Sequence, residues 1–318
     1  MTAVGVIFSS MHEENIPELS GHRTMASVPF GGRYRMIDFT LSNMVNAGIT
    51  TVGLMTKTNY QSLIDHIGSG KEWDLARKDG GIVLLPPYID ENETVITTRL
   101  EALKGIIGFL DRCKQDYVVL SDCDGVARMD LQAVIAFHEQ KGADITMVTH
   151  NQPVVRTHYY MTVKSDKEDR VTEIRINPPA KGRADVFVNV MILRRNYLID
   201  IVRNAIACGY TSFGRDILLK SVDTAKIYDY KFEGYYGGIT SMTAYFKHNM
   251  ELLDADVRRE LFGARDIYTK VKDSAPSEYG KNAKVSNSLI SDGCEIYGTV
   301  RNSILFRGVK VARGAVVE

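Results

Sequence analysis

The sequence predicts an α/β protein with a parallel, doubly wound sheet, and two observations support this. Short apolar runs, typical of buried strands, alternate with segments of helical periodicity. The chain of 318 residues is 44% hydrophobic, which is enough for a sizeable core and favours one large domain with a smaller one. In this order along the chain we expect strands at 3–8, 50–55, 82–85, 117–120 and 144–148, and helices at 59–67, 99–110 and 131–140.

Ligands of such sheets bind at the carboxyl ends of the strands. Two loops follow predicted strands and are therefore the expected walls of a site. The first is the long polar segment 9–23, and the second is Asp122-Cys123-Asp124.

The segment 30–49 combines a glycine turn, two basic residues and an amphipathic helix. Gly31 and Gly32 permit a sharp turn, and Arg33 and Arg35 stand just before a helix that carries Asp38 in its first turn. Arginines beside a helix N-terminus can form an anion site. A capped core helix with no ligand is an equally good interpretation of this pattern.

Charge and cysteine usage restrict the function classes. Lys+Arg and Asp+Glu both number 39, so no overall field attracts nucleic acid or an anionic membrane. The four cysteines form no CxxC pair, which favours a reduced, cytoplasmic setting without a disulfide framework. The first residues lack the basic start and apolar length of a signal peptide, and no long apolar segment predicts a membrane span.

The second half of the chain is more mixed. Further strands are expected at 160–163, 171–176, 186–193, 227–232 and 235–239, with helices at 197–207, 213–222 and 243–253. Periodicity weakens over 254–284, which indicates a connector. After it, glycines at 293, 308 and 314 each precede an aliphatic residue by three positions, a pattern that resembles the hexapeptide rule of a left-handed parallel β-helix. About two coils fit, so we expect either more chain beyond Glu318 or docking of this unit on the main domain.

Several blocks resemble the glucose-1-phosphate adenylyltransferases. They are 30–49, 56–67 (TKTNYQSLIDHI), Trp73, 84–86, 118–124, 212–216 (SFGRD), 245–249 (YFKHN) and 287–306, in order along nearly the whole chain. The resemblance implies a Rossmann-like nucleotidyltransferase domain followed by the start of a left-handed parallel β-helix. It divides the chain into a nucleotidyltransferase-like domain (1–253), a connector (254–284) and a β-helix (285–318). It also implies tetramers, Mg²⁺, ATP and glucose 1-phosphate, which give ADP-glucose and pyrophosphate for glycogen synthesis.

The chain departs from the family at the nucleotide phosphates. The family's glycine-rich loop after the first strand reads SSMHEEN at 9–15, where Glu13 and Glu14 would repel a triphosphate. Arg23 remains, but Met25 replaces a lysine that is expected to contact phosphate. The family's YRGTADAV run becomes 96–103 (ITTRLEAL) and loses its glycine.

The metal and sugar positions are also altered. Of two family aspartates on Mg²⁺, Asp124 remains and Gly238 stands in place of the other. Asp122 could partly replace the lost ligand, although a solvated aspartate is the simpler interpretation. The family's EKP becomes Asn177-Pro178-Pro179, and a strand glycine becomes Asn189.

These losses suggest a catalytically impaired, regulatory subunit of the GlgD type, which partners a catalytic homologue in a heterotetramer. Arg23 and Asp124 are the residual catalytic candidates. One alternative is an active adenylyltransferase with Asp122 and Asp124 on Mg²⁺ and Arg23, Arg33 or Arg99 on phosphates. Another is a sensor of ATP, glucose 1-phosphate or a sugar-phosphate effector. Its candidate ligand residues are His22, Arg23, Arg33, Arg35 and Lys57.

Some residues receive only a structural interpretation at this stage. Asp216 is expected either to support a ligand pocket or to cap a helix. The seven histidines show no metal-binding spacing, so core or surface roles are expected for them.

Overall fold

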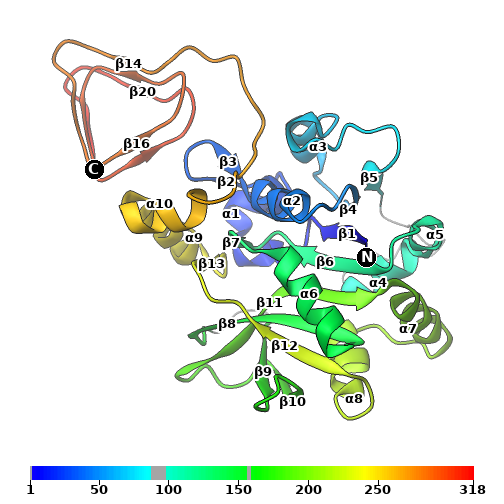
Figure 1. Ribbon diagram of the computed structural model, residues 1–318. Helices are drawn as coiled ribbons and strands as arrows, with labels where there is room; N and C mark the ends of the chain where they lie inside the picture. Colours follow the sequence, from blue (N-terminus) through cyan, green and yellow to red (C-terminus); the bar gives the residue numbers. More distant parts are fainter. Residues whose placement is uncertain (1, 87–97, 156–158) are drawn as a thin grey trace.

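The computed structural model describes residues 2–86, 98–155 and 159–318, and its centre is one mixed sheet (Figure 1). The strand order is β10-β9-β11-β6-β1-β4-β5, and β8 pairs with both β11 and β12. The strands are β1 (Ala3–Phe8), β4 (Thr51–Met55), β5 (Gly81–Leu85), β6 (Tyr117–Asp122), β8 (Ile145–Pro153), β9 (Met161–Ser165), β10 (Val171–Ile176), β11 (Arg183–Arg194) and β12 (Ile227–Lys231).

The predicted parallel sheet is present in its first half and gives way to antiparallel pairing in the second. β6, β1, β4 and β5 are parallel neighbours. The long strand β11 then pairs antiparallel with β6, β8 and β9. The alternation of strands and helices that indicates a parallel sheet is lost after β8, where strands follow one another directly and can pair antiparallel.

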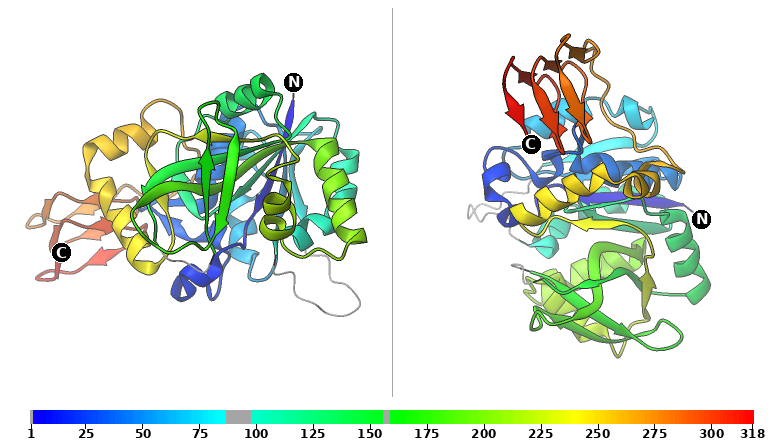
Figure 2. Two further views of the ribbon diagram at one scale, coloured as in Figure 1. Left: turned by 90° about the horizontal axis from the view of Figure 1, so that it is seen from below. Right: turned by 90° about the vertical axis from the view of Figure 1, so that its left-hand side faces the viewer.

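Helices cover both faces of the sheet, and each face has its own apolar core (Figures 1 and 2). Along β1, Ile7 belongs to one core while Val6 and Phe8 belong to the other, as the alternation of a strand requires. Helices α2 (Met36–Asn46) and α6 (Leu131–Lys141) pack on the first face. Helices α4 (Arg99–Gly105), α5 (Ile107–Arg112) and α7 (Arg195–Ala207) pack on the second. The helix predicted over 99–110 is thus divided at Ile106, whose φ and ψ of −110° and 10° are not helical.

The segment 30–49 forms a hairpin that leads into α2. Strands β2 (Pro29–Phe30) and β3 (Tyr34–Arg35) pair antiparallel around Gly31 and Gly32, whose φ angles are 59° and 84°. The Asp38 carboxylate accepts a hydrogen bond from the Arg35 backbone N–H at 2.9 Å and caps the start of α2. Gly48, with φ of 78°, follows the helix end as predicted.

The hairpin contacts two later parts of the chain. Tyr245 and Asn249, on α9 (Met242–Met250), hydrogen-bond to Pro29 O at 2.7 Å and to Gly31 N at 2.9 Å. A Cβ on Gly32 would lie 2.6 Å from Ser291 Oγ, so the turn also lies directly against the C-terminal strands.

The C-terminal part consists of short strands that pair in parallel between successive turns of the chain. They form three small sheets, β14-β17-β20, β15-β18-β21 and β16-β19, around buried side chains that include Cys294, Ile296 and Val311. Ile296 and Val311 each follow a glycine by three positions, and both point inward, as the sequence pattern requires. The strands are β14 (Glu278–Tyr279), β15 (Lys284–Ser286), β16 (Leu289–Ile290), β17 (Glu295–Ile296), β18 (Thr299–Arg301), β19 (Ile304–Leu305), β20 (Lys310–Val311) and β21 (Val316–Val317).

The predicted boundary at residue 285 differs from the strand pairing. β14 already pairs with β17, so the paired strands begin at Glu278. The predicted connector, 254–284, also contains the helix α10 (Ala255–Phe262). Phe262 of α10 stacks on Tyr34 with ring centroids 5.1 Å apart, which anchors this segment on the hairpin.

The shorter elements are α1 (Pro17–Ser20), α3 (Gln61–Ile67), β7 (Gly125–Ala127), α8 (Leu219–Ser221) and β13 (Tyr236–Gly238), with a π-helical turn over Phe213–Leu218. No helix in the described part of the chain is long and apolar enough to cross a membrane.

Replacing Gly32 with valine should destabilise the protein more than replacing Gly48 with valine. Both positions have positive φ, so both substitutions carry backbone strain of about 1–3 kcal/mol. Only Gly32 has close neighbours, whereas nothing lies within 4 Å of a Cβ on Gly48. We expect Gly32→Val to cost about 1–3 kcal/mol more in urea unfolding, because it also forces the packing apart. Equal losses for both variants would show that the hairpin does not hold the C-terminal strands.

Candidate functional site

The two loops predicted as site walls meet at the carboxyl ends of β1 and β6. These strands are parallel neighbours, and Phe8 at the end of β1 is the register partner of Asp122 at the end of β6. The chain after β1 therefore brings His12 to the aspartates that follow β6. His12 has a left-handed backbone (φ 63°) just before the 3₁₀ turn Glu13–Asn15.

Four charged side chains form a buried cluster at this edge, His12, Arg99, Asp122 and Asp124. His12 Nε2 lies 3.0 Å from Asp122 Oδ2 and 3.8 Å from Asp124 Oδ2. The Arg99 guanidinium donates to Asp122 Oδ2 at 2.6 Å. Each aspartate thus has an internal cation within ion-pair distance.

The protonation states follow from this arrangement. Burial alone would lower the pKa of His12, but the carboxylates of Asp124 and Asp122 outweigh it and raise its pKa to about 9. Burial alone would raise the pKa of Asp122, but Arg99 and His12 hold it below its usual value. Near neutral pH the cluster therefore contains an imidazolium and a guanidinium opposite two carboxyl groups.

Asn189 completes the cluster from β11. Its Nδ2 donates to Asp124 Oδ2 at 2.8 Å, and its φ of 60° is a conformation that glycine adopts most readily. The family resemblance implies a glycine at position 189. Asn189 keeps a backbone conformation that suits glycine, and its side-chain amide lies beside Asp124.

Gly238, where the resemblance implies the second metal aspartate, lies beside the cluster as expected. It is the register partner of Gly125 in the pairing of β13 with β7, and the next residue, Ile239, donates its N–H to Asp124 O at 2.7 Å. The backbone at this position is in place, but it has no side chain to offer a metal.

The residues present do not fit a Mg²⁺ ion. Mg²⁺ prefers oxygen ligands in octahedral geometry. Asp122 Oδ1 is a buried oxygen without a hydrogen-bond partner in the described part of the chain. Among the carboxylate oxygens of the two aspartates it is the one buried atom without a partner in the described residues, and Arg99 and His12 already balance the two carboxylates and would repel a divalent ion. The one set of three His, Cys, Asp or Glu residues close enough for a shared ion among the described residues is His12, Asp122 and Asp124, whose imidazole suits a transition metal better than Mg²⁺.

A pocket of about 450 Å³ opens beside the cluster. Its walls come from the loop after β1, from Lys57, from the start of α4 and from Ser212-Phe213-Gly214. Glu13 and Glu14 line it too, and burial is the main cause that raises the pKa of Glu13. Acidic side chains here replace the backbone N–H groups that a glycine-rich loop would present to phosphate.

Met25 does not reach this pocket as a lysine could. Its side chain is fully buried in the core below α2, within the 3₁₀ turn Met25–Ser27. An apolar contact has therefore replaced a cation at this position.

The other predicted ligand residues lie away from the cluster. Arg35 donates to Ser62 Oγ at 2.8 Å, and its pKa is lowered by burial and by the nearby Arg23. The Arg33 guanidinium lies 5.6 Å from the Tyr34 ring centroid. Asp216 accepts backbone hydrogen bonds from Thr211 and Ser212, at 3.2 and 3.0 Å, in a capping role.

The anion site considered at the start of α2 is taken by the protein's own groups. Asp38 is fully buried there, and His66 Nε2 lies 2.6 Å from its Oδ1. Of the altered run at 96–103, residues 96 and 97 lie outside the described part of the chain, and Thr98 caps α4.

The contacts of His12 and of Asn189 with the two aspartates were not predicted from the sequence. The expectation of an ordinary core or surface role for the histidines did not single out His12, which pairs with Asp122. The signal for His12 was its place in the sequence. It follows the first strand, which is the parallel neighbour of the strand that carries the aspartates. For Asn189, an asparagine in place of a glycine was the signal, because asparagine also tolerates positive φ.

The sheet and its charged site define an α/β protein of the nucleotidyltransferase type. Residues 16–254 match the family model described as "Nucleotidyl transferase". A glucose-1-phosphate adenylyltransferase of Thermosipho africanus is 34% identical over 92% of this chain and 72% of its own length. The glycogen biosynthesis protein GlgD of Bacillus subtilis is 32% identical over 99% of this chain and 82% of its own. A glucose-1-phosphate adenylyltransferase of Clostridium botulinum is 33% identical over 99% and 83%. The chain belongs to this nucleotidyltransferase family of glucose-1-phosphate adenylyltransferases and GlgD proteins.

Substituting Arg99 with methionine should destabilise the protein strongly, because Asp122 would lose its main cation inside the protein. We expect a loss of about 3–5 kcal/mol in the free energy of unfolding, measured with urea. Arg203→Met is the matched control, since Arg203 pairs with Asp111 at 3.0 Å on the surface. That variant should lose less than about 1 kcal/mol. Similar losses would contradict the view that Asp122 depends on Arg99.

The His12 imidazole should titrate near pH 9 in the folded protein. The measurement is a pH titration followed by ¹⁵N-histidine NMR, with the signal assigned through His12→Gln. In Asp124→Asn the pKa of His12 should fall, because a carboxylate that favours the imidazolium is removed.

The raised pKa of His12 also makes the stability of the protein depend on pH. Since the folded pKa lies above the usual value of 6.5, the stability that His12 contributes should be complete below pH 6.5 and lost as the pH rises toward 9. A His12 pKa at or below 6.5 would refute the ion-paired arrangement.

Proposed function

We propose that this chain is a regulatory, catalytically impaired subunit of a glucose-1-phosphate adenylyltransferase in glycogen biosynthesis. It would associate in the cytoplasm with a catalytic homologue in a heterotetramer, which makes ADP-glucose and pyrophosphate from ATP and glucose 1-phosphate. The observation that carries the proposal is the internal neutralisation of Asp122 and Asp124 by His12 and Arg99, with Asn189 on Asp124.

The impairment follows from charge. Phosphoryl-transfer sites stabilise developing negative charge with metal ions and cations that face the substrate. In this chain the cations face the protein's own carboxylates, Gly238 offers no ligand and Met25 is buried. Mg²⁺, ATP and glucose 1-phosphate would then act mainly in the catalytic partner.

We further propose the division of the chain into a nucleotidyltransferase-like domain (1–253), a connector (254–284) and the start of a left-handed β-helix (285–318). Parallel pairing of β16 with β19 and of β17 with β20, together with the inward-facing Ile296 and Val311, supports the β-helix. Val285 and Val316 on this unit are 39% and 64% exposed, which favours a role of its surface in subunit contacts.

Effector sensing is a second candidate function, and the grouping of arginines favours it. Arg23 and Arg307 both lie close enough to Arg35 to lower its pKa, although burial is the larger cause. Three guanidinium groups that repel one another favour a multiply charged anion such as a sugar phosphate. In this proposal Arg33, Lys57 and Asp216 are further candidate contacts or supports. Calorimetry of the isolated chain with ATP, glucose 1-phosphate and fructose bisphosphate tests it, and no heat with any of them would reject it.

The regulatory proposal is tested by ADP-glucose synthesis of the catalytic homologue with and without this chain. We expect the chain to raise the rate, or to shift the effector response, by about fivefold or more, a typical coupling between sites. The chain alone should make no more product than its Asp124→Asn variant. No effect on the homologue would refute the regulatory function. Synthesis by the chain alone that Asp124→Asn abolishes would instead favour an active enzyme with a rearranged site.

A further inference from the structure

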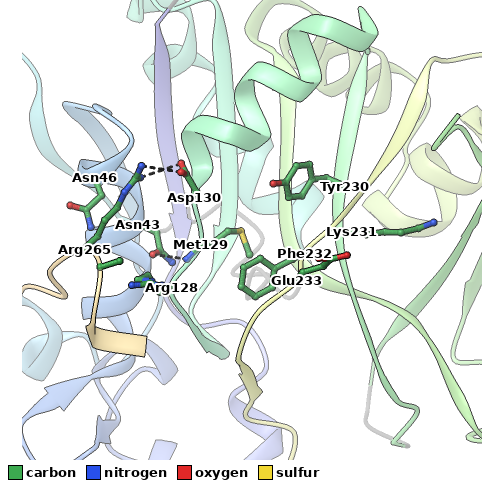
Figure 3. Close-up of a pocket in the computed structure, with 11 residues that line it drawn as sticks. Asn43, Asn46, Arg128, Met129, Asp130, Tyr230, Lys231, Phe232, Glu233 and Arg265 are labelled. Carbon is green, nitrogen blue, oxygen red and sulfur yellow. Dashed lines mark hydrogen bonds and ion pairs between the residues drawn. The ribbon is translucent and has the colours of Figure 1, made fainter. Parts of the chain in front are cut away.

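A second pocket, of about 370 Å³, lies at the opposite end of α2 from Arg35 (Figure 3). It shares no lining residue with the pocket beside the cluster. Its walls come from the end of α2, from the loop that joins β7 to α6, from the end of β12 and from the segment after α10. Four separate parts of the chain thus meet around one cavity.

The backbone on both sides of Arg128 is held in place at this pocket. The Asn43 side chain, on α2, donates to Ala127 O at 3.0 Å and accepts from Met129 N at 3.0 Å. These two bonds bracket Arg128 and fix the backbone on both sides of it. The loop that carries Arg128 is therefore already positioned by α2 before an anion binds.

Among the residues that the structure describes, none forms an ion pair with the Arg128 guanidinium. Its Nη1 atom is buried and has no hydrogen-bond partner in the part of the chain that the structure describes. A buried, unsatisfied N–H of a charged group costs more than a neutral one. The group therefore favours an anion in the pocket, where a charge-assisted, bidentate contact becomes possible.

The charged residues of the lining carry a net positive charge, and of its two arginines only Arg265 has an ion pair among the described residues. The lining has three cations (Arg128, Lys231, Arg265) and two acids (Asp130, Glu233). Arg265 donates to both oxygens of Asp130, at 3.1 and 2.9 Å, so these two neutralise each other. Figure 3 shows this pair, with Lys231 extending away from it.

The apolar side chains of the lining define the rest of the ligand. Met129 and Phe232 both contribute to the pocket, and an aromatic face offers a planar or apolar group a favourable contact. The volume lies at the lower end of the range for small-molecule sites. We propose that this pocket binds a small phosphate monoester, whose phosphate contacts Arg128 and whose carbon body packs on Met129 and Phe232.

The pocket lies between the loop at Asp124 and the segment that leads to the C-terminal strands. Arg128 follows β7, and β7 begins directly after Asp124. Arg265 and Asp266 lie in the segment that leads to the C-terminal strands, and Asp266 O accepts from Asn46 of α2 at 3.0 Å. Binding here would stabilise the charged-cluster loop and the connector together.

The test is a titration with phenyl phosphate, followed by NMR of ¹³C-methyl methionine. Met129 lines this pocket and Met11 lines the pocket beside the cluster, so the two methyl signals report on the two sites separately. The signals are assigned with Met129→Leu and Met11→Leu. We expect the Met129 signal to shift and saturate, with weaker binding of inorganic phosphate and no comparable shift with phenol.

Variants of Arg128 test the contact itself. Arg128→Gln should weaken binding about ten- to a hundredfold, because one charge-assisted contact is lost, and Arg128→Lys should lie between it and the unaltered protein. Arg313→Gln, which removes an exposed arginine of the C-terminal unit, should bind as the unaltered protein does.

Three results would overturn the proposal. One is a Met129 signal that does not move up to roughly 10 mM phenyl phosphate, well above a millimolar dissociation constant. Another is a shift at Met11 alone, which would assign the ligand to the pocket beside the cluster. The third is phenol acting as strongly as phenyl phosphate, which would remove the role of the anion. All three are decided with the unaltered protein, so they hold even if Arg128→Gln does not fold.

Discussion

The tight turn at Gly31 and Gly32 is the constraint on which the arrangement of the two parts of the molecule depends. Both residues have positive φ, and Gly32 lies so close to Ser291 that a Cβ would lie 2.6 Å from the serine oxygen. A side chain at this turn would push the C-terminal strands away from the sheet domain. The same hairpin holds α9 through Tyr245 and Asn249 and positions the start of α2. One local backbone requirement therefore fixes several tertiary contacts.

Charge balance at the end of β6 is what separates this site from a metal centre. Two buried carboxylates cost far more than they contribute unless cations accompany them. A metal ion would supply that charge only while bound, whereas His12 and Arg99 supply it permanently. The folded protein thus gains a cluster whose carboxylates are paired with cations of the same chain, and our proposal of impaired catalysis rests on this pairing.

The sequence predicted the parallel half of the sheet well, because its strands alternate with helices and leave few alternatives. It also located the site loops, since parallel strands bring their carboxyl ends to one edge. The antiparallel pairing of β11 with β6 could not be predicted from periodicity. An apolar run such as Val186–Leu193 has the same pattern whether its strand runs parallel or antiparallel to its neighbours. The identity of the cluster was missed for a related reason. The partners of Asp122 lie 23 and 110 residues away, on Arg99 and His12, and only the fold brings them together.

Helix α2 explains why so much of segment 30–49 resembles active enzymes although the phosphate loop does not. Its polar side chains contact other parts of the chain rather than solvent. Thr40 donates to Asp122 O at 3.3 Å, Asn43 clamps the β7–α6 loop, and Ser42 accepts from Tyr268 N at 2.9 Å. A helix that places these segments is needed for the shape of the domain whether or not chemistry occurs. Arg35, which directly precedes α2, lies near Arg307 of the C-terminal unit, so it stands where that unit meets the sheet domain.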